Sequence, residues 1–461
     1  MRVLRFTMAV LLLGPLLTGC ARVSRPERNL AERLEYDAVV QARYQLDPEW
    51  WKQYDDPRLN QVVEVALANN IDLAKAAVSV NRALYQAKLL AADLVPGFSG
   101  GLDASARKNI RTGAPSSRSV GGDLTLSYEL DLWQKIADAA SAARWEYEAS
   151  VEDLENARLA LINSVVDAYC QLAYLNEAIS AGQLNLKNLR AIESTVGAKH
   201  EAGKVAAVEP AQARQAVLNA ENSLTDYRVQ HKNAEQTLKD LLNLKPHQPL
   251  DLEGQTLANL RPPRLDLNIP LSVLANRPDL RAAEYRLEKA FKQVEEAEKG
   301  WLPNLSLSSA ISSAGQAFNT AWEAPVAGGA LSINLPFLDW SRVLYNLRIS
   351  ETDFESTRLD FEKTLTTALN EVDAYYFRYE KSRQTLGNSR RKYASDARIS
   401  QYHQDRYEAG AGELSDWLEA LNAANSSRLS ALNALYQTIQ YENMVYKAMA
   451  GRYVDLARGQ P

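Results

Sequence analysis

The stretch QYHQDRYEAGAGELSDWLEA, residues 401–420, lies at the centre of the region that decides the fold. Residues 337–460 contain no proline, and glycine is sparse there except around the turn Glu408-Ala409-Gly410. Because proline breaks a helix interior, this region favours long helices on both sides of that turn. The sequence therefore predicts a helical hairpin over residues 340–453. At about 1.5 Å per residue, we expect each arm to reach on the order of 80 Å or more.

The same hairpin occurs twice in the sequence. Val166-Asp167-Ala168-Tyr169 recurs as Val372-Asp373-Ala374-Tyr375, and Glu201-Ala202-Gly203 recurs as Glu408-Ala409-Gly410. The offsets are 372 − 166 = 206 and 408 − 201 = 207, so the two copies keep nearly one register over a whole helix. A period this long indicates an internal duplication.

The duplication divides the chain into two similar halves. We expect a first repeat at about residues 50–245 and a second at about residues 270–455, within one protomer of residues 20–461. A linker rich in proline separates them. In the first repeat, Asp55-Asp56-Pro57 predicts the start of a helix, and residues 67–73 predict a turn that interrupts it.

The N-terminus is typical of an exported lipoprotein. Arg2 and Arg5 precede the apolar run 8–17, which is too short to span a bilayer as a helix. The sequence then reads Leu17-Thr18-Gly19-Cys20, which resembles a bacterial lipobox. We expect residues 1–19 to be a signal peptide and Cys20 to carry covalent lipid, such as palmitate. The alternative is a plain signal peptide with an incidental cysteine. Because Ala21 follows, and not aspartate, we expect sorting to the outer membrane.

Composition and motifs argue against several other functions. The net charge is −5 with no basic stripe, which gives no support to nucleic-acid binding. The four histidines have no metal-like spacing, and no nucleophile elbow, Walker loop or zinc-protease motif is present. The second cysteine, Cys170, is expected to be a small packing residue. We therefore expect no enzyme, no metal site and no cofactor apart from the lipid on Cys20.

Alternating apolar and polar residues predict four strands, two in each repeat. They lie near residues 98–110, 121–132, 303–313 and 328–338, and a polar loop at 111–122 joins the first two. A period of two suits a transmembrane barrel strand, and it suits a half-buried soluble hairpin equally well. Because the strand pair recurs in the second repeat, the duplication favours one barrel built from repeated pairs.

The helix of the first hairpin has two apolar seams and one polar face. Two seams indicate that it packs against neighbours on both sides. Two interpretations of the polar face stay open: the inner surface of a closed ring of helices, or an ordinary solvated face. That face carries Glu152, Asn163, Asp167, Gln171 and Glu177.

These features together resemble the outer membrane factor family, the TolC-like ducts, and within it the acylated efflux lipoproteins. The resemblance covers nearly the whole mature chain in the order of the family. It rests on residues 17–20 and on the stretches WWKQYDDP (50–57), YELDLW (128–133), RPDLRAAE (277–284), WLPNL (301–305) and LPFLD (335–339).

The resemblance implies a mainly α-helical fold with transmembrane β-structure. Each protomer of a homotrimer would give four strands to a twelve-stranded outer-membrane β-barrel, continued by a long periplasmic α-helical barrel. A protomer with four strands has open sheet edges, which independently demands oligomerisation.

The resemblance also implies a periplasmic gate at the hairpin turns. In several relatives an arginine-tyrosine pair and an aspartate form links that close the aperture. Here Arg406 and Tyr407 match that pair, and the carboxylate is Glu419, with Asp416 one helical turn earlier. The alternative is that these carboxylates only favour the start of a helix, where its dipole stabilises negative charge.

The implied function is the exit duct of a tripartite efflux system in the outer membrane. It would carry drugs, toxic compounds or metal ions from an inner-membrane pump and a periplasmic adaptor to the exterior. The alternatives are a duct for an ATP-driven exporter or type I secretion system, and a coiled-coil lipoprotein stalk. Candidate adaptor-docking residues lie in the two turns: Gly203, Lys204, Val205, Gly410, Ala411 and Gly412.

Overall fold

The computed structural model describes residues 44–108, 110–111, 116–250, 252, 254–260 and 271–455. The expected signal peptide and the lipidated Cys20 lie outside these residues. The described residues divide into two compact units. The first comprises Tyr85–Glu146 and Tyr285–Leu359, and the second comprises residues 44–84, 147–284 and 360–455.

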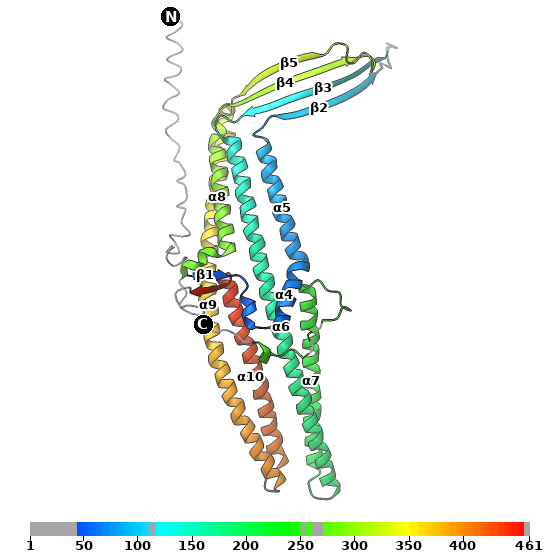
Figure 1. The fold of residues 1–461 in the computed structure, drawn as a ribbon, viewed down its shortest axis with the longest axis vertical. Coiled ribbons are helices and arrows are strands. Elements are labelled where there is room, and N and C mark those ends of the chain that lie inside the picture. Colours follow the sequence, from blue (N-terminus) through cyan, green and yellow to red (C-terminus); the bar gives the residue numbers. More distant parts are fainter. Residues whose placement is uncertain are drawn as a thin grey trace. The chain divides into compact units, whose positions relative to one another are not determined.

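The first unit contains an antiparallel sheet with the order β2-β3-β4-β5 (Figure 1). Its strands are β2 (Gly97–Arg107), β3 (Ser117–Leu130), β4 (Asn304–Gly315) and β5 (Val326–Asn334). The central pair, β3 with β4, joins the two repeats, with Val120 opposite Gly315 and Leu130 opposite Leu305. Large apolar side chains on the sheet are exposed, among them Phe98, Leu102, Leu331 and Ile333. The four strands predicted from alternation are therefore present.

All four strands differ from the predicted bounds by some residues, and two ends differ most. β3 begins at Ser117, inside the segment expected to be a loop. At Gly122, an added Cβ would lie only 2.6 Å from Trp322 and 2.7 Å from Leu102, so this close approach requires glycine. Because glycine has no side chain, it interrupts the alternation of apolar and polar residues that predicts a strand. β5 ends at Asn334, and the 3-10 helix η6 (Pro336–Asp339) follows. The prediction of strand through residue 338 was wrong because Pro336 has no N–H to continue a ladder.

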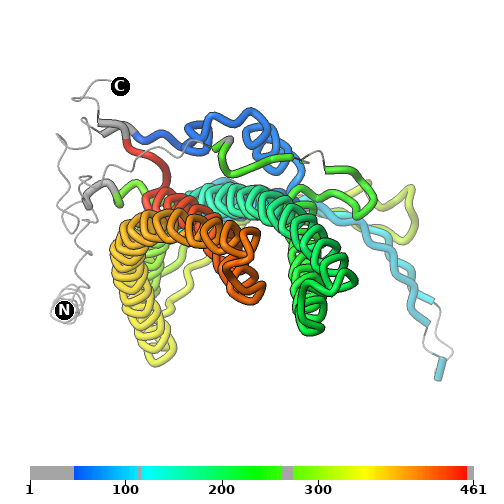
Figure 2. Tube along the Cα trace, turned by 90° about the horizontal axis from the view of Figure 1, so that it is seen from below, coloured from blue at the N-terminus to red at the C-terminus, as the bar shows by residue number. Residues whose placement is uncertain are grey.

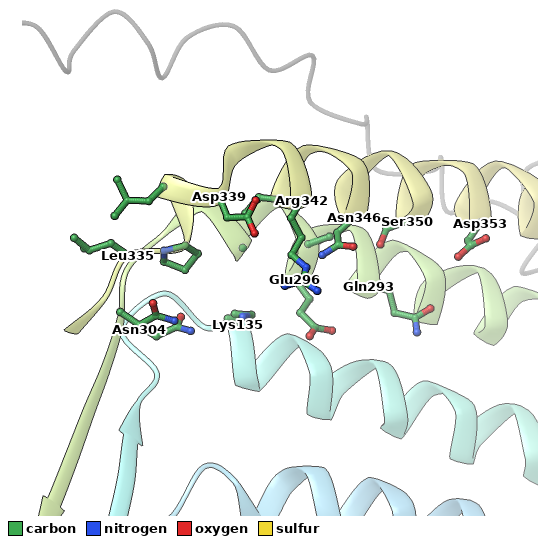
Figure 3. Close-up of a pocket in the computed structure, with 16 residues that line it drawn as sticks. Lys135, Gln293, Glu296, Asn304, Leu335, Asp339, Arg342, Asn346, Ser350 and Asp353 are labelled. Carbon is green, nitrogen blue, oxygen red and sulfur yellow. The ribbon is translucent and has the colours of Figure 1, made fainter. Parts of the chain in front are cut away.

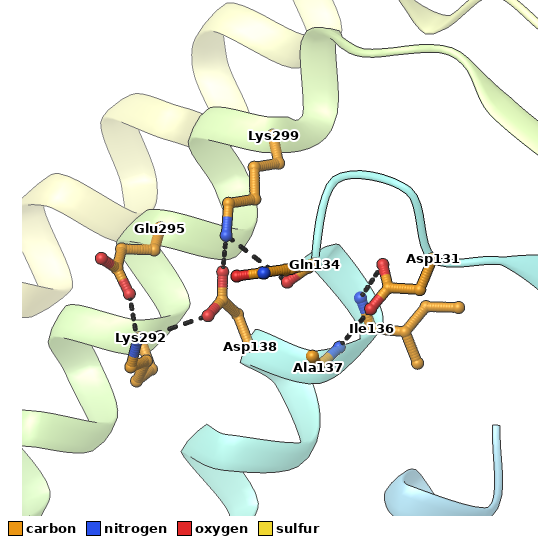
Figure 4. Close-up of polar contacts among 8 residues, drawn as sticks. All are labelled: Asp131, Gln134, Ile136, Ala137, Asp138, Lys292, Glu295 and Lys299. Carbon is orange, nitrogen blue, oxygen red and sulfur yellow. Dashed lines mark hydrogen bonds and ion pairs between the residues drawn. The ribbon is translucent and has the colours of Figure 1, made fainter. Parts of the chain in front are cut away.

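Charged side chains fasten the helix that follows β3 to its neighbour within this unit (Figure 4). Both carboxylate oxygens of Asp131 accept hydrogen bonds, from the backbone N–H groups of Ile136 at 3.0 Å and Ala137 at 2.8 Å. The buried Asp138 pairs with Lys299 and, at 3.4 Å, with Lys292. Asp131 thus caps the start of α6 (Lys135–Glu201), and the two ion pairs of Asp138 join that start to the end of α8 (Pro278–Glu298) and to the 3-10 helix after it, η5 (Lys299–Trp301).

The two predicted hairpins are present. The first is α6 with α7 (Val208–Leu241), and the second is α9 (Trp340–Glu408) with α10 (Leu414–Ala448). Figure 2 shows each as a pair of adjacent helices. α6 has 67 residues and α9 has 69, which correspond to about 100 Å. α7 and α10, with 34 and 35 residues, reach only about 50 Å, so the expectation that each arm reaches on the order of 80 Å or more was wrong for the second helix of each hairpin. Among the described residues, none of the helices combines the length and the apolar composition that a membrane span needs.

A belt of short elements covers the hairpins in the second unit. It includes η2 (Trp50–Tyr54), α4 (Pro57–Asn69) and η3 (Leu257–Asn259). Their apolar side chains form one buried cluster with the hairpins, in which Trp50 and Tyr54 pack with Tyr169, Ile439 and others. Cys170 is buried in the same cluster, as predicted. α5 (Ile71–Ala92) follows α4 after Asn70, whose Oδ1 accepts from Leu73 N at 3.0 Å.

The polar face of α6 is neither of the two surfaces that we expected. Asn163 Nδ2 donates to the carbonyl of Asn443 at 2.9 Å, and Asp167 accepts from the Tyr436 hydroxyl at 3.1 Å. Both partners lie on α10. At these two residues the face therefore packs against the second hairpin, and polarity alone does not distinguish such a face from a solvated one. Two further members also have partners: Glu152 pairs with Arg281, and Glu177 accepts from the backbone of Leu257.

In each repeat, the residue before a helix-starting proline joins a short helix to a long one. Asp56 caps α4 by accepting from Arg58 N at 2.9 Å, and its Oδ2 accepts from Tyr169 OH of α6 at 2.6 Å. Arg277, before α8, donates to Glu371 of α9 at 3.0 Å and to the Ala448 carbonyl at the end of α10 at 2.7 Å.

A small sheet joins the two ends of the described chain. β1 (Tyr44–Asp47) pairs antiparallel with β6 (Arg452–Asp455), with Leu46 opposite Tyr453. Gly451, at φ +140°, makes this approach possible, because an added Cβ would lie 2.8 Å from the Asp47 carbonyl oxygen.

Candidate functional site at the helical turns

The two hairpin turns have the same backbone geometry. In the first, Gly203 has φ +70° and the N–H of Lys204 donates to the Lys199 carbonyl at 2.9 Å. In the second, Gly410 has φ +71° and the N–H of Ala411 donates to the Arg406 carbonyl at 2.9 Å. Each glycine thus takes the left-handed conformation that ends a helix. The requirement for a positive φ accounts for both glycines, so neither glycine has to be explained by contact with another protein.

The candidate docking residues lie at the surface of these turns. Gly203, Lys204, Gly410 and Ala411 are exposed, and an added Cβ at either of these two glycines would meet nothing within 4 Å. Gly412 differs, because a Cβ there would lie 3.1 Å from Arg406 Cβ. It is small because the turn folds back on its own helix. Val205 is half-buried and packs on the apolar cluster below the turns.

Tyr407 joins the second hairpin to the first. Its hydroxyl donates to Glu209 Oε2 at 3.2 Å, at the start of α7. Its ring packs on Trp417 with centroids 5.4 Å apart, and the Lys199 ammonium of α6 lies 4.2 Å from the ring centroid. Burial, followed by the Glu209 carboxylate, raises the pKa of Tyr407 to about 12. The tyrosine therefore stays protonated and remains a hydrogen-bond donor to Glu209 at physiological pH.

The other predicted gate residues are not brought together within this chain. Arg406 is exposed, and its Nη2 donates to the Ala411 carbonyl at 2.6 Å. Asp416 and Glu419 are exposed on α10, and neither has a hydrogen-bond or ion-pair partner in the described part of the chain. The carboxylates of Asp416 and Glu419 are therefore available to a neighbouring molecule, whereas Arg406 is held against its own turn.

Sequence reasoning missed Glu209, although the repeat contained the signal. It looked for the carboxylate partner of Tyr407 within the second hairpin. At the offset of the turns, 416 − 207 = 209, so Glu209 is the first-repeat equivalent of Asp416. Each occupies the first turn of the short helix of its hairpin.

A groove and an apolar cluster lie between the hairpins near the turns. The cluster packs Leu189 and Val196 of α6 against Leu414 and Leu418 of α10. The groove measures about 380 Å³. Its lining comes from α6, α9 and α10, and includes Ile192, Thr195, Lys199, Gln404, Tyr407 and Trp417. The two hairpins therefore meet through apolar packing in addition to the tyrosine link.

A larger cavity of about 990 Å³ lies in the first unit, where strands give way to helices (Figure 3). Its walls are polar and charged, and include Lys135, Glu296, Asp339, Arg342 and Asp353. None of these five side chains has an ion-pair partner in the described part of the chain. No group of three or more potential metal ligands occurs among the described residues.

A family model described as "Outer membrane efflux protein" matches the chain over residues 62–244 and again over residues 269–451. The chain belongs to the outer membrane efflux protein family. Two matches of one model to one chain agree with the internal duplication read from the sequence.

Members of the outer membrane efflux protein family resemble this chain over nearly its whole length. It is 45% identical to toxin and drug export protein A of Aggregatibacter actinomycetemcomitans, over 95% of this chain and 96% of the relative. It is 28% identical to the pyoverdine export outer membrane protein OpmQ of Pseudomonas putida, over 94% and 95%. Among solved structures, the Campylobacter jejuni CmeC outer membrane channel superposes with a TM-score of 0.79 at 26% identity, covering 88% of each chain.

Membership of this family confirms the predicted fold class, location and function. The chain is a TolC-like efflux channel of the outer membrane, and it is not an enzyme. The stalk hypothesis is thereby set aside. In this chain, the turns described above carry exposed charged side chains, such as Lys204 and Arg406, and the hydrogen bond from Tyr407 to Glu209 that joins the two hairpins.

Proposed function

We propose that three copies of the chain form one continuous exit duct. The sheet carries this proposal, because β2 and β5 are edge strands of the four-stranded sheet of the described chain. Inside a bilayer, an open edge leaves N–H and C=O groups without partners, so an isolated four-stranded sheet is not viable there. Three copies supply three times four strands, which close into a twelve-stranded barrel.

The strand lengths support a membrane-spanning role for this sheet. β2 has 11 residues, β4 has 12 and β5 has 9, close to the roughly 9–11 residues that a tilted transmembrane strand needs. Exposed apolar residues on the strands suit contact with lipid. Unheated and heated samples of outer-membrane protein, run on denaturing gels, test the assembly. A heat-sensitive trimer band is expected, and monomer under every condition would contradict it.

The turns are the proposed docking surface for a periplasmic adaptor protein, which links the duct to an inner-membrane pump. Exposure of Gly203, Lys204, Gly410 and Ala411 supports this assignment. A photo-crosslinking residue at Ala411 in intact cells is expected to capture the adaptor. The matched control is the same residue at Leu218, which is 44% exposed on α7 away from the turn. Equal capture at both positions, or none at Ala411 in folded protein, would contradict docking.

The cargo that we propose is small molecules such as drugs or toxic compounds, delivered by a proton-driven pump. The name of the relative from Aggregatibacter, a toxin and drug export protein, supports this class. The same name includes toxin export, so an ATP-driven exporter or type I secretion system is the second candidate. Deletion of the gene is expected to raise drug susceptibility. Loss of a secreted protein with unchanged susceptibility would favour the second candidate.

We also propose that Cys20 carries the lipid anchor, on the strength of the lipobox-like Leu17-Thr18-Gly19-Cys20. Labelling of cells with a fatty-acid analogue is expected to mark the wild-type protein and not Cys20→Ala. The matched control is Cys170→Ala, which changes the second, buried cysteine. Loss of label in Cys170→Ala, or equal label in Cys20→Ala, would contradict the assignment.

A further inference from the structure

The register of the four-stranded sheet divides its residues between two faces. Successive residues of a strand point to opposite sides, and residues opposite one another in an antiparallel pair share a side. Leu102 lies opposite Gly122, and Leu124 lies opposite Ile311. The first face is apolar and carries Phe98, Leu102, Leu124, Leu126, Ile311 and Leu331. The second face is polar and carries Ser99, Asp103, Asp123, Ser127, Ser306 and Ser308. In the proposed duct, the apolar face contacts lipid and the polar face lines the interior.

Arg118 is an exception on the apolar face. It lies opposite Ala106 and therefore on the same side of the sheet as Leu102. Among the residues of the four described strands, it is the only charged one on this face. Its side chain is exposed, and it has no hydrogen-bond or ion-pair partner in the described part of the chain. A charge on the lipid face of a barrel is costly at the centre of the bilayer and well tolerated near its surface. Arg118 therefore marks the level of a polar layer.

The length of β3 places that layer at the exterior side of the membrane. The helices follow the Leu130 end of β3 (Figure 1), so in an outer-membrane channel that extends into the periplasm the Arg118 end faces outward. Arg118 is 130 − 118 = 12 residues from Leu130. At about 3.3 Å per residue and a tilt of about 40°, these residues rise about 30 Å, whereas the apolar band of a barrel is about 25 Å tall. Arg118 thus reaches the headgroups of the outer leaflet.

Trp322, in the connection between β4 and β5, lies on the same face. Its ring covers Gly122, where an added Cβ would lie 2.6 Å from it, and 51% of the side chain remains exposed. Gly122 is four residues from Arg118 on the side of the membrane centre. Toward the exterior, the face therefore carries first Leu124, then the indole of Trp322, then the guanidinium of Arg118. Tryptophan prefers the boundary between hydrocarbon and headgroups, so this order fits a lipid surface.

The exterior end of the sheet has a local excess of positive charge. Residues 104–122 contain four cations and no carboxylate, and residues 316–325 contain one charged residue, Glu323. The four cations are Arg107, Lys108, Arg111 and Arg118. The whole chain, in contrast, has a net charge of −5. Charge complementarity therefore calls for an anionic partner at this end.

We propose that Arg118 and Trp322 form a binding site for lipopolysaccharide, the phosphorylated glycolipid of the outer leaflet. The guanidinium of Arg118 donates to a phosphate of the glycolipid, and the indole of Trp322 packs on the base of its acyl chains. Arginine suits this role, because its planar fork matches the oxygens of a phosphate. The other cations of the connection attract the same phosphates at longer range. This inference rests on the proposed membrane-spanning duct.

Binding of lipid A, the phosphorylated membrane anchor of lipopolysaccharide, to the purified full-length protein in detergent tests the site. Arg118→Ala is expected to weaken the affinity about tenfold, the effect of one hydrogen bond to a charged group. Arg118→Lys keeps the charge and is expected to lose less. The matched control is Arg107→Ala, because Arg107 lies opposite Ser117, at the same level of the sheet but on its polar face. Its affinity for lipid A is expected to stay within about twofold of the wild type, since a surface charge acts weakly at a distance.

Two further probes define the partner. Lipid A without its phosphates is expected to bind the wild type about tenfold more weakly, and to bind the wild type and Arg118→Ala equally well. Vesicles of phosphatidylglycerol, an anionic phospholipid, are expected to show no difference between the wild type and Arg118→Ala. A loss of vesicle binding in Arg118→Ala as large as the loss of lipid A binding would overturn the assignment to the glycolipid.

The remaining outcomes separate this inference from the proposed function. Equal losses of lipid A binding in Arg118→Ala and Arg107→Ala would overturn the site, because they would show only a general attraction to positive charge. Unchanged binding in Arg118→Ala, measured on protein that runs as a heat-sensitive trimer, would overturn the site and leave the duct intact. Absence of the trimer in the wild type would overturn the proposed function itself.

Discussion

The Tyr169 hydroxyl donates to Asp56 Oδ2 over 2.6 Å and thereby ties α6 to the cap of α4. Tyr169 is 1% exposed and Asp56 is 6% exposed, so water does not replace this contact. Burial, followed by the Asp56 carboxylate, raises the pKa of Tyr169 far above its usual range. The phenol is therefore a permanent donor, and the belt is held on the first hairpin at every physiological pH.

Replacement of Tyr169 by phenylalanine is expected to destabilise the protein by about 1–3 kcal/mol, because it leaves a buried carboxylate oxygen without a partner. Thermal unfolding of the purified protein measures the effect. Tyr345→Phe is the matched control, since Tyr345 is 66% exposed on α9. Equal melting temperatures for Tyr169→Phe and the control would show that the hydrogen bond contributes nothing.

Arg277→Lys is expected to cost about 3 kcal/mol of stability. The planar guanidinium donates to Asp279 through Nε and Nη2 and to the Ala448 carbonyl through Nη1, and lysine cannot reproduce these directions. Arg348→Lys, a change at a side chain that is 67% exposed and paired with Glu351, is the control. Chemical denaturation monitored by circular dichroism compares the two. Similar denaturation midpoints for the two variants would show that Arg277 does not hold α8, α9 and α10 together.

Glu442 is expected to make stability fall as the pH rises. Burial raises the pKa of this carboxyl to about 8 from an ordinary 4.5, against opposing effects of the Tyr446 hydroxyl and Arg383. Between these values the folded state holds a proton that the unfolded chain releases. Stability is therefore full below about pH 4.5 and is lost progressively up to about pH 8, at about 1.4 kcal/mol per pH unit.

Glu442→Gln tests this dependence, because glutamine has no proton to lose. Melting temperatures across the pH range are expected to decline in the wild type and to stay flatter in the variant. Above about pH 8, the variant is expected to be the more stable of the two. Parallel pH profiles for both proteins would show that Glu442 is not responsible.

Tyr407→Phe is expected to raise the open probability of the channel about tenfold, because it removes one hydrogen bond to a carboxylate and keeps the ring on Trp417. Single-channel recording in planar bilayers provides the measurement. Tyr345→Phe is the control, because Tyr345 is 66% exposed on the same helix and far along the chain from the turn. Of the two second-hairpin carboxylates, Asp416→Asn is expected to increase opening and Glu419→Gln is not. The reverse order would favour Glu419 as the gate carboxylate.

The sequence predicted the elements whose chemistry is local. Missing prolines, the Asp56-Pro57 helix start and the strand alternation in both repeats located the hairpins, α4 and the four strands. The turn at Gly410 was predictable for the same reason, because a left-handed residue after a helix favours glycine.

Contacts between elements distant in the sequence were not predictable from local pattern. The polar face of α6 has the composition of a wet surface, but Asn163 and Asp167 bind α10. The partner of Tyr407 lies 198 residues away, at Glu209. Before a structure is known, only the register of the two repeats relates residues so far apart in the sequence. That register identified the hairpins, and a comparison of the two turns in the same register would have pointed to Glu209.

The pairing of β1 with β6 turns the two ends of the described chain into one mechanical junction. Tension on the N-terminal segment, where the lipid anchor is proposed, is transmitted first to a ladder of four residue pairs. The opposite half of that ladder comes from the C-terminal end of the chain. A truncation that removes β6 would therefore leave β1 without its partner strand, so the C-terminal end of the chain contributes directly to holding the segment next to the proposed anchor.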